Sequence, residues 1–164
     1  MSTSIAIWGS VLFHEKRLQG NELAGELASG SIMVLEPGTW IGKEFPLFAE
    51  VANDQQIRHG RWLLVFYHND CDACRSAVPF YRKLAISYLI NNVSTHVAFI
   101  RMPSENNASD ELVPQSDAYS RLSLSNRYQW FATTPLLVGV EEGQVVLAVD
   151  GEDAMKLPSA FPWH

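Results

Sequence analysis

The chain has 164 residues and a formal net charge of −6, with 47% hydrophobic and 18% charged residues. This length suits one domain, or one domain with an extension, and the apolar content suffices for one core. Because no basic stripe is present, we expect no nucleic-acid partner. The apolar stretch Ile5–Phe13 contains Gly9 and Ser10. It is too short to span a bilayer, so we expect no membrane span in this chain.

The first 60 residues carry weak patterns. Asn21 and Gly30 are suited to begin and end a short helix. The apolar run within residues 31–36 predicts a strand, which ends at the turn pair Pro37-Gly38. Residues 45–53 place apolar side chains at helical spacing and predict a short helix.

Residues 61–101 carry the strongest pattern. Residues 61–68 are almost continuously apolar and aromatic, which is typical of a strand buried on both faces. A helical pattern follows from Cys71 to about Ile90, with Pro79 inside it as the expected position of a kink. Residues 95–101 predict a second buried strand. The three elements form a βαβ unit, so we expect parallel strands joined by a right-handed crossover.

The rest of the chain is predicted to complete the sheet. Residues 103–117 are polar and predict a surface loop, and residues 118–126 are assigned to a short helix. Residues 136–140 and 144–149 predict two strands of a hairpin. The expected order for residues 61–149 is therefore β-α-β-α-β-β.

Cys71 and Cys74 are the only two cysteines of the chain. A secreted disulfide scaffold has several pairs, and a structural zinc site needs four ligands. The spacing places both thiols on neighbouring positions of a helical first turn, within reach of a disulfide. The positive end of the helix favours a thiolate. We therefore expect Cys71, nearer the terminus, to be the nucleophile and Cys74 to resolve the mixed disulfide.

Thr134-Pro135 stands between the predicted short helix and the hairpin, where a cis X-Pro bond makes a tight turn. Such a turn leaves the backbone of Thr134 available to pair with an extended partner chain. Tyr67 is expected to wall the dithiol with apolar surface. The expected substrate-binding residues are Tyr67, Asp72, Ala73, Thr134 and Pro135.

The stretch Tyr67–Arg75, with Pro79 and Thr134-Pro135, resembles the thioredoxin-like superfamily over about residues 40–150. The resemblance implies a three-layer α/β/α fold with a central mixed sheet in residues 37–164. Residues 1–36 are then an N-terminal extension packed on that domain. It also implies a monomeric thiol-disulfide oxidoreductase that acts on protein disulfides or dithiols and needs no cofactor or metal.

Residues 42–48, Gly-Lys-Glu-Phe-Pro-Leu-Phe, resemble the entry segment of TlpA-like and peroxiredoxin-like members. Those members are often extracytoplasmic and anchored to a membrane, so the resemblance favours such a location in a bacterium. A cytoplasmic location stays open.

Four positions depart from the family pattern. Asp70 replaces the usual Trp before the first cysteine, Asp72-Ala73 replaces Gly-Pro or Pro-Pro, and Val65 replaces a buried acid. A module that retains the fold without turnover therefore stays open, as a partner-docking domain or a metal carrier with His68 near the thiols. Sco-type copper chaperones space their cysteines more widely than Cys71 and Cys74, which makes copper binding less favoured here. Peroxidases of this fold have a threonine where this chain has His68, so the usual peroxidase pattern is absent.

Overall fold

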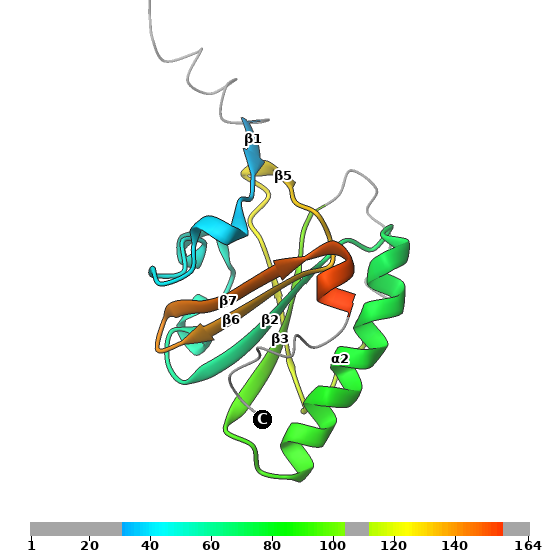
Figure 1. Cartoon of the computed structure of the whole chain (residues 1–164). Coiled ribbons are helices and arrows are strands. Elements are labelled where there is room, and N and C mark those ends of the chain that lie inside the picture. Colours follow the sequence, from blue (N-terminus) through cyan, green and yellow to red (C-terminus); the bar gives the residue numbers. More distant parts are fainter. Residues whose placement is uncertain (1–30, 104–111, 156–164) are drawn as a thin grey trace, which may run out of the picture.

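The computed structural model describes residues 31–103 and 112–155 (Figure 1). The helix predicted between Asn21 and Gly30 lies outside the described residues, as does most of the predicted N-terminal extension. No helix within the described ranges is long and apolar enough to cross a membrane.

A five-stranded mixed sheet forms the centre of the molecule, in the order β4-β3-β2-β6-β7. Its strands are β2 (Arg61–Tyr67), β3 (Thr95–Arg101), β4 (Ser120–Ser123), β6 (Leu136–Glu141) and β7 (Gln144–Asp150). Strands β2, β3 and β4 are parallel, whereas β6 is antiparallel to β2 and β7 to β6. Six of the seven residues of β2 are buried, because this strand lies in the middle of the sheet. The predicted central mixed sheet and the βαβ unit are confirmed.

Helix α2 (Asp72–Ile90) covers one face of the sheet (Figure 1). Cys71 is its N-cap, and Asn92, just beyond its end, has a positive φ of 50° that stops helical propagation. Pro79 lies inside the helix. The inward side of α2 packs against odd-numbered residues of β2 and β3, which point to the same face because side chains alternate along a strand. This cluster includes Leu63, Val65, Tyr67, Cys74, Val78, Tyr81, Val97, Phe99 and Leu137.

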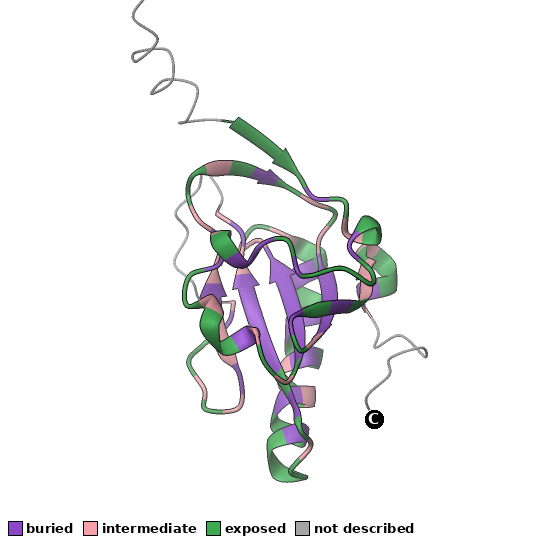
Figure 2. Ribbon diagram, turned by 90° about the vertical axis from the view of Figure 1, so that its left-hand side faces the viewer, coloured by how far each residue is buried: buried purple, intermediate pink, exposed green. Residues whose placement is uncertain are grey.

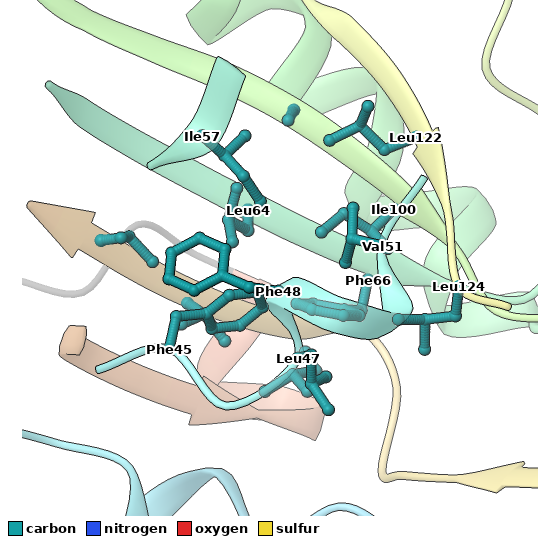
Figure 3. Close-up of a cluster of buried hydrophobic side chains, with 14 of the residues drawn as sticks. Phe45, Leu47, Phe48, Val51, Ile57, Leu64, Phe66, Ile100, Leu122 and Leu124 are labelled. Atoms are coloured by element: carbon teal, nitrogen blue, oxygen red, sulfur yellow. The ribbon is translucent and has the colours of Figure 1, made fainter. Parts of the chain in front are cut away.

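The opposite face of the sheet is covered by residues 35–57, which contain the 3₁₀ helices η1 (Pro37–Thr39), η2 (Phe48–Glu50) and η3 (Asp54–Ile57). The short helix predicted for residues 45–53 is therefore only one 3₁₀ turn. Even-numbered side chains of the sheet pack against this layer (Figure 3). The cluster includes Phe45, Leu47, Phe48, Val51, Ile57, Leu64, Phe66, Ile100, Leu122 and Leu124.

The short helix predicted for residues 118–126 is wrong. Residues 120–123 form β4, which pairs in parallel with the edge of β3. Leu122 and Leu124 are two residues apart, so in an extended chain both side chains point to the same face and pack in the core. Pairing with the free edge of the sheet outweighs the weak helical pattern of this short segment.

A second, two-stranded parallel sheet joins β1 (Ser31–Val34) to β5 (Tyr128–Phe131). The strand predicted for residues 31–36 is thus present, although it pairs outside the main sheet. Figure 1 places this small sheet at the end of the molecule where α2 begins, and Figure 2 shows β1 exposed along its length.

Candidate functional site

The dithiol sits where β2 ends and α2 begins. The backbone N–H of Cys71 donates to the carbonyl of His68, which closes the turn between the two elements. Cys71 and Cys74 form a disulfide, and their Cα atoms are 5.2 Å apart. The N–H of Cys74 donates to Sγ of Cys71 across 3.1 Å. The Cys71 sulfur therefore accepts one of the N–H groups that have no partner within the helix.

The two sulfurs differ in access. Cys71 is half-buried and lies next to the surface, whereas Cys74 has no exposed surface. Only Cys71 of the two can therefore be approached from the surface. This asymmetry follows from position, because the N-cap residue lies outside the helix while Cys74, one turn later, faces the sheet.

Thr134 and Pro135 lie beside the dithiol, on the loop that enters β6. Because β6 pairs with β2 and Phe66 is aligned with Leu136, this loop meets the end of β2 where the dithiol begins. The Thr134–Pro135 peptide bond is cis. The hydroxyl of Thr134 donates to Sγ of Cys71 at 3.4 Å, and the Thr134 carbonyl oxygen lies 3.7 Å from the same sulfur. The sequence pointed to the Thr134 backbone and missed the hydroxyl contact, for which the only signal is a threonine before that proline.

The remaining predicted site residues divide into two groups. Asp72 and Ala73 are exposed on the first turn of α2, beside the half-buried Cys71. Tyr67 is 1% exposed and lies in the apolar cluster that contains Cys74. It therefore walls the buried side of the dithiol and does not face the surface.

Negative charge flanks the exposed sulfur. Asp70 and Asp72 stand on either side of Cys71 in the chain, and both are exposed. The guanidinium of Arg75 is directed to the carbonyl of Asn69, at 3.5 Å. The positive end of α2 favours a thiolate on Cys71, while the two carboxylates oppose it.

Apolar groups surround Cys74. The described buried cluster around it contains no carboxylate, and Val65 is fully buried within it. Tyr81 brings a hydroxyl into this cluster, but that hydroxyl donates to the Ala154 carbonyl at 2.8 Å, and burial raises the Tyr81 pKa. Among the described residues, proton exchange with Cys74 therefore has no buried acid to use.

His68 lies between β2 and the dithiol and is half-buried. Burial lowers its pKa, and this effect outweighs the nearby Asp70 charge and the hydrogen bond with the Met102 backbone, which both act in the opposite direction. Within residues 31–103 and 112–155, no three His, Cys, Asp or Glu side chains gather closely enough to hold a metal ion.

Several solved structures are similar to this chain. The thioredoxin domain of a thiol-disulfide oxidoreductase from Bacteroides vulgatus is 14% identical, with a TM-score of 0.46 over 62% of this chain and 78% of that one. A thiol:disulfide interchange protein DsbE from Chlorobium tepidum is 14% identical, with a TM-score of 0.43 over 59% and 72%. Apo Sco1 from Thermus thermophilus is 19% identical, with a TM-score of 0.37 over 62% and 75%. No protein-family model and no curated protein matches the chain.

These identities and TM-scores are low, so we identify the fold from the strand order and the position of the helix. The strand order is β3-β2-β6-β7, with the first pair parallel and the others antiparallel, and one long helix follows the central strand and covers one face of the sheet. The dithiol begins that helix, and Pro135 enters the antiparallel strand opposite it. This chain therefore has the thioredoxin-like fold that its sequence resembles.

Proposed function

We propose that this protein exchanges disulfides with partner proteins through Cys71 and Cys74. The observation that carries the proposal is the unequal access of the two sulfurs at the start of α2, since Cys71 is half-buried and Cys74 is fully buried. Such a pair suits a two-step exchange, in which one thiol meets the partner and the second closes the ring.

The reaction begins from the reduced protein. The Cys71 thiolate attacks one sulfur of a partner disulfide, which breaks the partner's S–S bond, forms a mixed disulfide and frees one partner thiolate. The Cys74 thiolate then attacks Sγ of Cys71, releases the second partner thiolate and leaves the Cys71–Cys74 disulfide. Two electrons pass to the partner in total. A dithiol donor restores the reduced protein by the reverse steps.

The hydrogen-bond donors around Cys71 support its role as the attacking thiol. The Cys74 N–H and the Thr134 hydroxyl both donate to its sulfur, which stabilises the thiolate as attacking and leaving group. Cys74 is fully buried among apolar side chains and out of the partner's reach, so it acts second. We infer that Asp72, Ala73 and Thr134 contact the partner chain, while Tyr67 supports Cys74 from below.

The test combines thiol labelling with turnover. Mass analysis after alkylation should find no labelled thiol in the oxidised protein and two after reduction. The reduced protein should accelerate the reduction of insulin disulfides by dithiothreitol. Cys71→Ser should abolish this activity, whereas Cys74→Ser should accumulate mixed disulfides. Two labelled thiols after oxidation would contradict the proposal.

The same preparation tests the alternative function, in which the protein has this fold but does not catalyse disulfide exchange. A protein that forms the disulfide but does not accelerate insulin reduction above the Cys71→Ser variant would be a docking module. Metal analysis of the purified reduced protein would identify a metal carrier, if it found stoichiometric metal that Cys74→Ser removes.

A further inference from the structure

Two neighbouring cavities lie beside β4, with volumes of about 250 and 330 Å³. Ala52, Arg101 and Ser123 line both of them. Segment 50–52 runs along the outer edge of the strand here, with Val51 bridged to Leu124 and the Ala52 N–H donating to the Ser123 carbonyl. The apolar floor nearby belongs to the core around Val51, Leu122 and Leu124 (Figure 3).

The cavities lie at the end of the sheet that also carries the dithiol. Tyr67, Arg101 and Ser123 are the last residues of the parallel strands β2, β3 and β4, and they are aligned in one row across the sheet. Ligands of open α/β sheets bind outside the carboxyl ends of such strands. The dithiol begins four residues after Tyr67 but two strands away from Ser123, so the cavities form a separate site.

Arg101 is the unusual residue of this site. It is partly buried, yet its guanidinium makes no hydrogen bond or ion pair with another residue in the described part of the chain. By contrast, Arg58, Arg61 and Arg127 each pair with a carboxylate. A guanidinium carries five donors and keeps its charge at every physiological pH, so one that lines a cavity favours acceptors of opposite charge.

The carboxylate in the described lining of the larger cavity, that of Glu50, already has other partners. Glu50 lines the larger cavity, but one of its oxygens accepts from the Ser125 hydroxyl at 2.5 Å and the other pairs with Arg127 at 3.4 Å. The smaller cavity has Arg121 in its lining beside Arg101, and no Asp or Glu among its described lining residues. Among the described lining residues, the charge of Arg101 is therefore left without a carboxylate partner.

We propose that these cavities bind an anionic group, a carboxylate or a phosphate, with Arg101 as its principal donor. The planar fork of a guanidinium matches two oxygens of either group and forms charge-assisted hydrogen bonds with them. The volumes are at or below the small end of the range for ligand pockets, so the site accommodates a small anion or one acidic side chain. The proposal stands apart from the dithiol chemistry.

The experiment titrates the full-length oxidised protein, labelled with ¹⁵N, at constant ionic strength so that charge screening stays fixed. The probes are citrate, inorganic phosphate, and a glutamate-containing peptide with its glutamine counterpart. We expect saturable shifts of the Ala52, Arg121 and Ser123 amides. Saturation by citrate or phosphate identifies a free small anion. Saturation only by the glutamate peptide identifies an acidic side chain of a partner protein.

Variants decide whether Arg101 is the donor. Arg101→Gln should weaken binding at least about tenfold, since a hydrogen bond to a charged group is worth about 1.5–3 kcal/mol. Lys83→Gln removes the same charge from an exposed position of α2 and should leave the affinity unchanged. Arg101→Lys keeps the charge without the fork and should bind with intermediate affinity. If the amide spectrum shows that Arg101→Gln does not fold, the affinity of Arg101→Lys is compared with that of the wild type instead.

Shifts that stay linear for every probe would overturn the proposal, as would equal affinities in the wild type and in the folded Arg101 variant. The insulin activity of Arg101→Gln should equal that of the wild type, because Arg101 takes no part in the exchange at Cys71. A failure of anion binding is therefore distinguishable from a failure of the redox proposal.

Discussion

The hydroxyl of Thr134 donates a hydrogen bond to Sγ of Cys71 across 3.4 Å, and the two residues are 63 positions apart in the sequence. The contact exists because β6 pairs with β2 and carries its entry loop to the start of α2. The sulfur thus receives donors from two elements, since the Cys74 N–H also points to it.

Thr134→Val should slow the reaction of Cys71. Valine keeps the shape of threonine but cannot donate, so the thiolate loses one charge-assisted hydrogen bond. We expect the alkylation rate at pH 7 to fall roughly three- to tenfold, which corresponds to about 0.7–1.4 kcal/mol and lies within the range for one ordinary hydrogen bond. The measurement is the rate of iodoacetamide labelling of the reduced protein in a Cys74→Ser background. Thr133→Val, at the exposed neighbouring residue, should leave the rate unchanged, and an equal loss there would reject the assignment.

Asp72→Asn should have the opposite effect. Asp72 begins α2 next to Cys71 in the chain, and its carboxylate opposes the formation of a thiolate there. Removing this charge should increase the thiolate fraction at pH 7, accelerate alkylation and shift the glutathione equilibrium toward the reduced protein. Asp117→Asn is the matched control, because this exposed residue precedes β4, which lies two strands away from β2 and the dithiol. An unchanged or slower rate for Asp72→Asn would mean that the carboxylate does not act on Cys71.

Tyr81→Phe should destabilise the fold without touching the dithiol. The Tyr81 hydroxyl donates to the carbonyl of Ala154, which ties the 3₁₀ helix η4 (Gly151–Met155) to α2. Both residues have no exposed surface, so the variant leaves a buried carbonyl without this donor. We expect a loss of about 1–3 kcal/mol in the free energy of unfolding by urea. Tyr128→Phe removes a hydroxyl that forms no hydrogen bond to a described residue, from a partly buried position of β5, and it should cost less.

His68 should make the stability of the protein dependent on pH. Burial is the largest effect on this residue and lowers its pKa from the ordinary 6.5. Near and below pH 6.5 the unfolded chain therefore binds more protons than the folded protein, so stability rises with pH through this window and is lost as the pH falls.

His68→Gln should flatten this dependence. Urea unfolding between pH 5 and 8 would measure it, and the variant should lose less stability than the wild type on acidification. His59→Gln, at an exposed histidine, should keep the wild-type slope. Identical slopes for wild type and His68→Gln would show that another group controls the acid sensitivity.

The sequence by itself determined the centre of this protein. Residues 62–67 are an unbroken apolar and aromatic run, which is typical of a strand buried on both faces, and the periodicity from Cys71 to about Ile90 predicts a long helix. The position of the dithiol at the start of that helix is a local property, because Asn69-Asp70 ends the strand and the cysteines come next. The hairpin of β6 and β7 follows from two apolar runs and a glycine-containing turn.

Only the tertiary structure decided which strands pair and which distant residues come into contact. Residues 120–123 form β4 because the edge of β3 is available for pairing, and β1 pairs with β5 outside the main sheet. The layer opposite α2 consists of 3₁₀ turns whose side chains fill the core although their helical pattern is weak. The meeting of Thr134 with Cys71, and of Arg101 with Ser123 and segment 50–52, depends on strand order and register. Strand order and register are fixed by packing across the whole sheet, so no single stretch of sequence contains them.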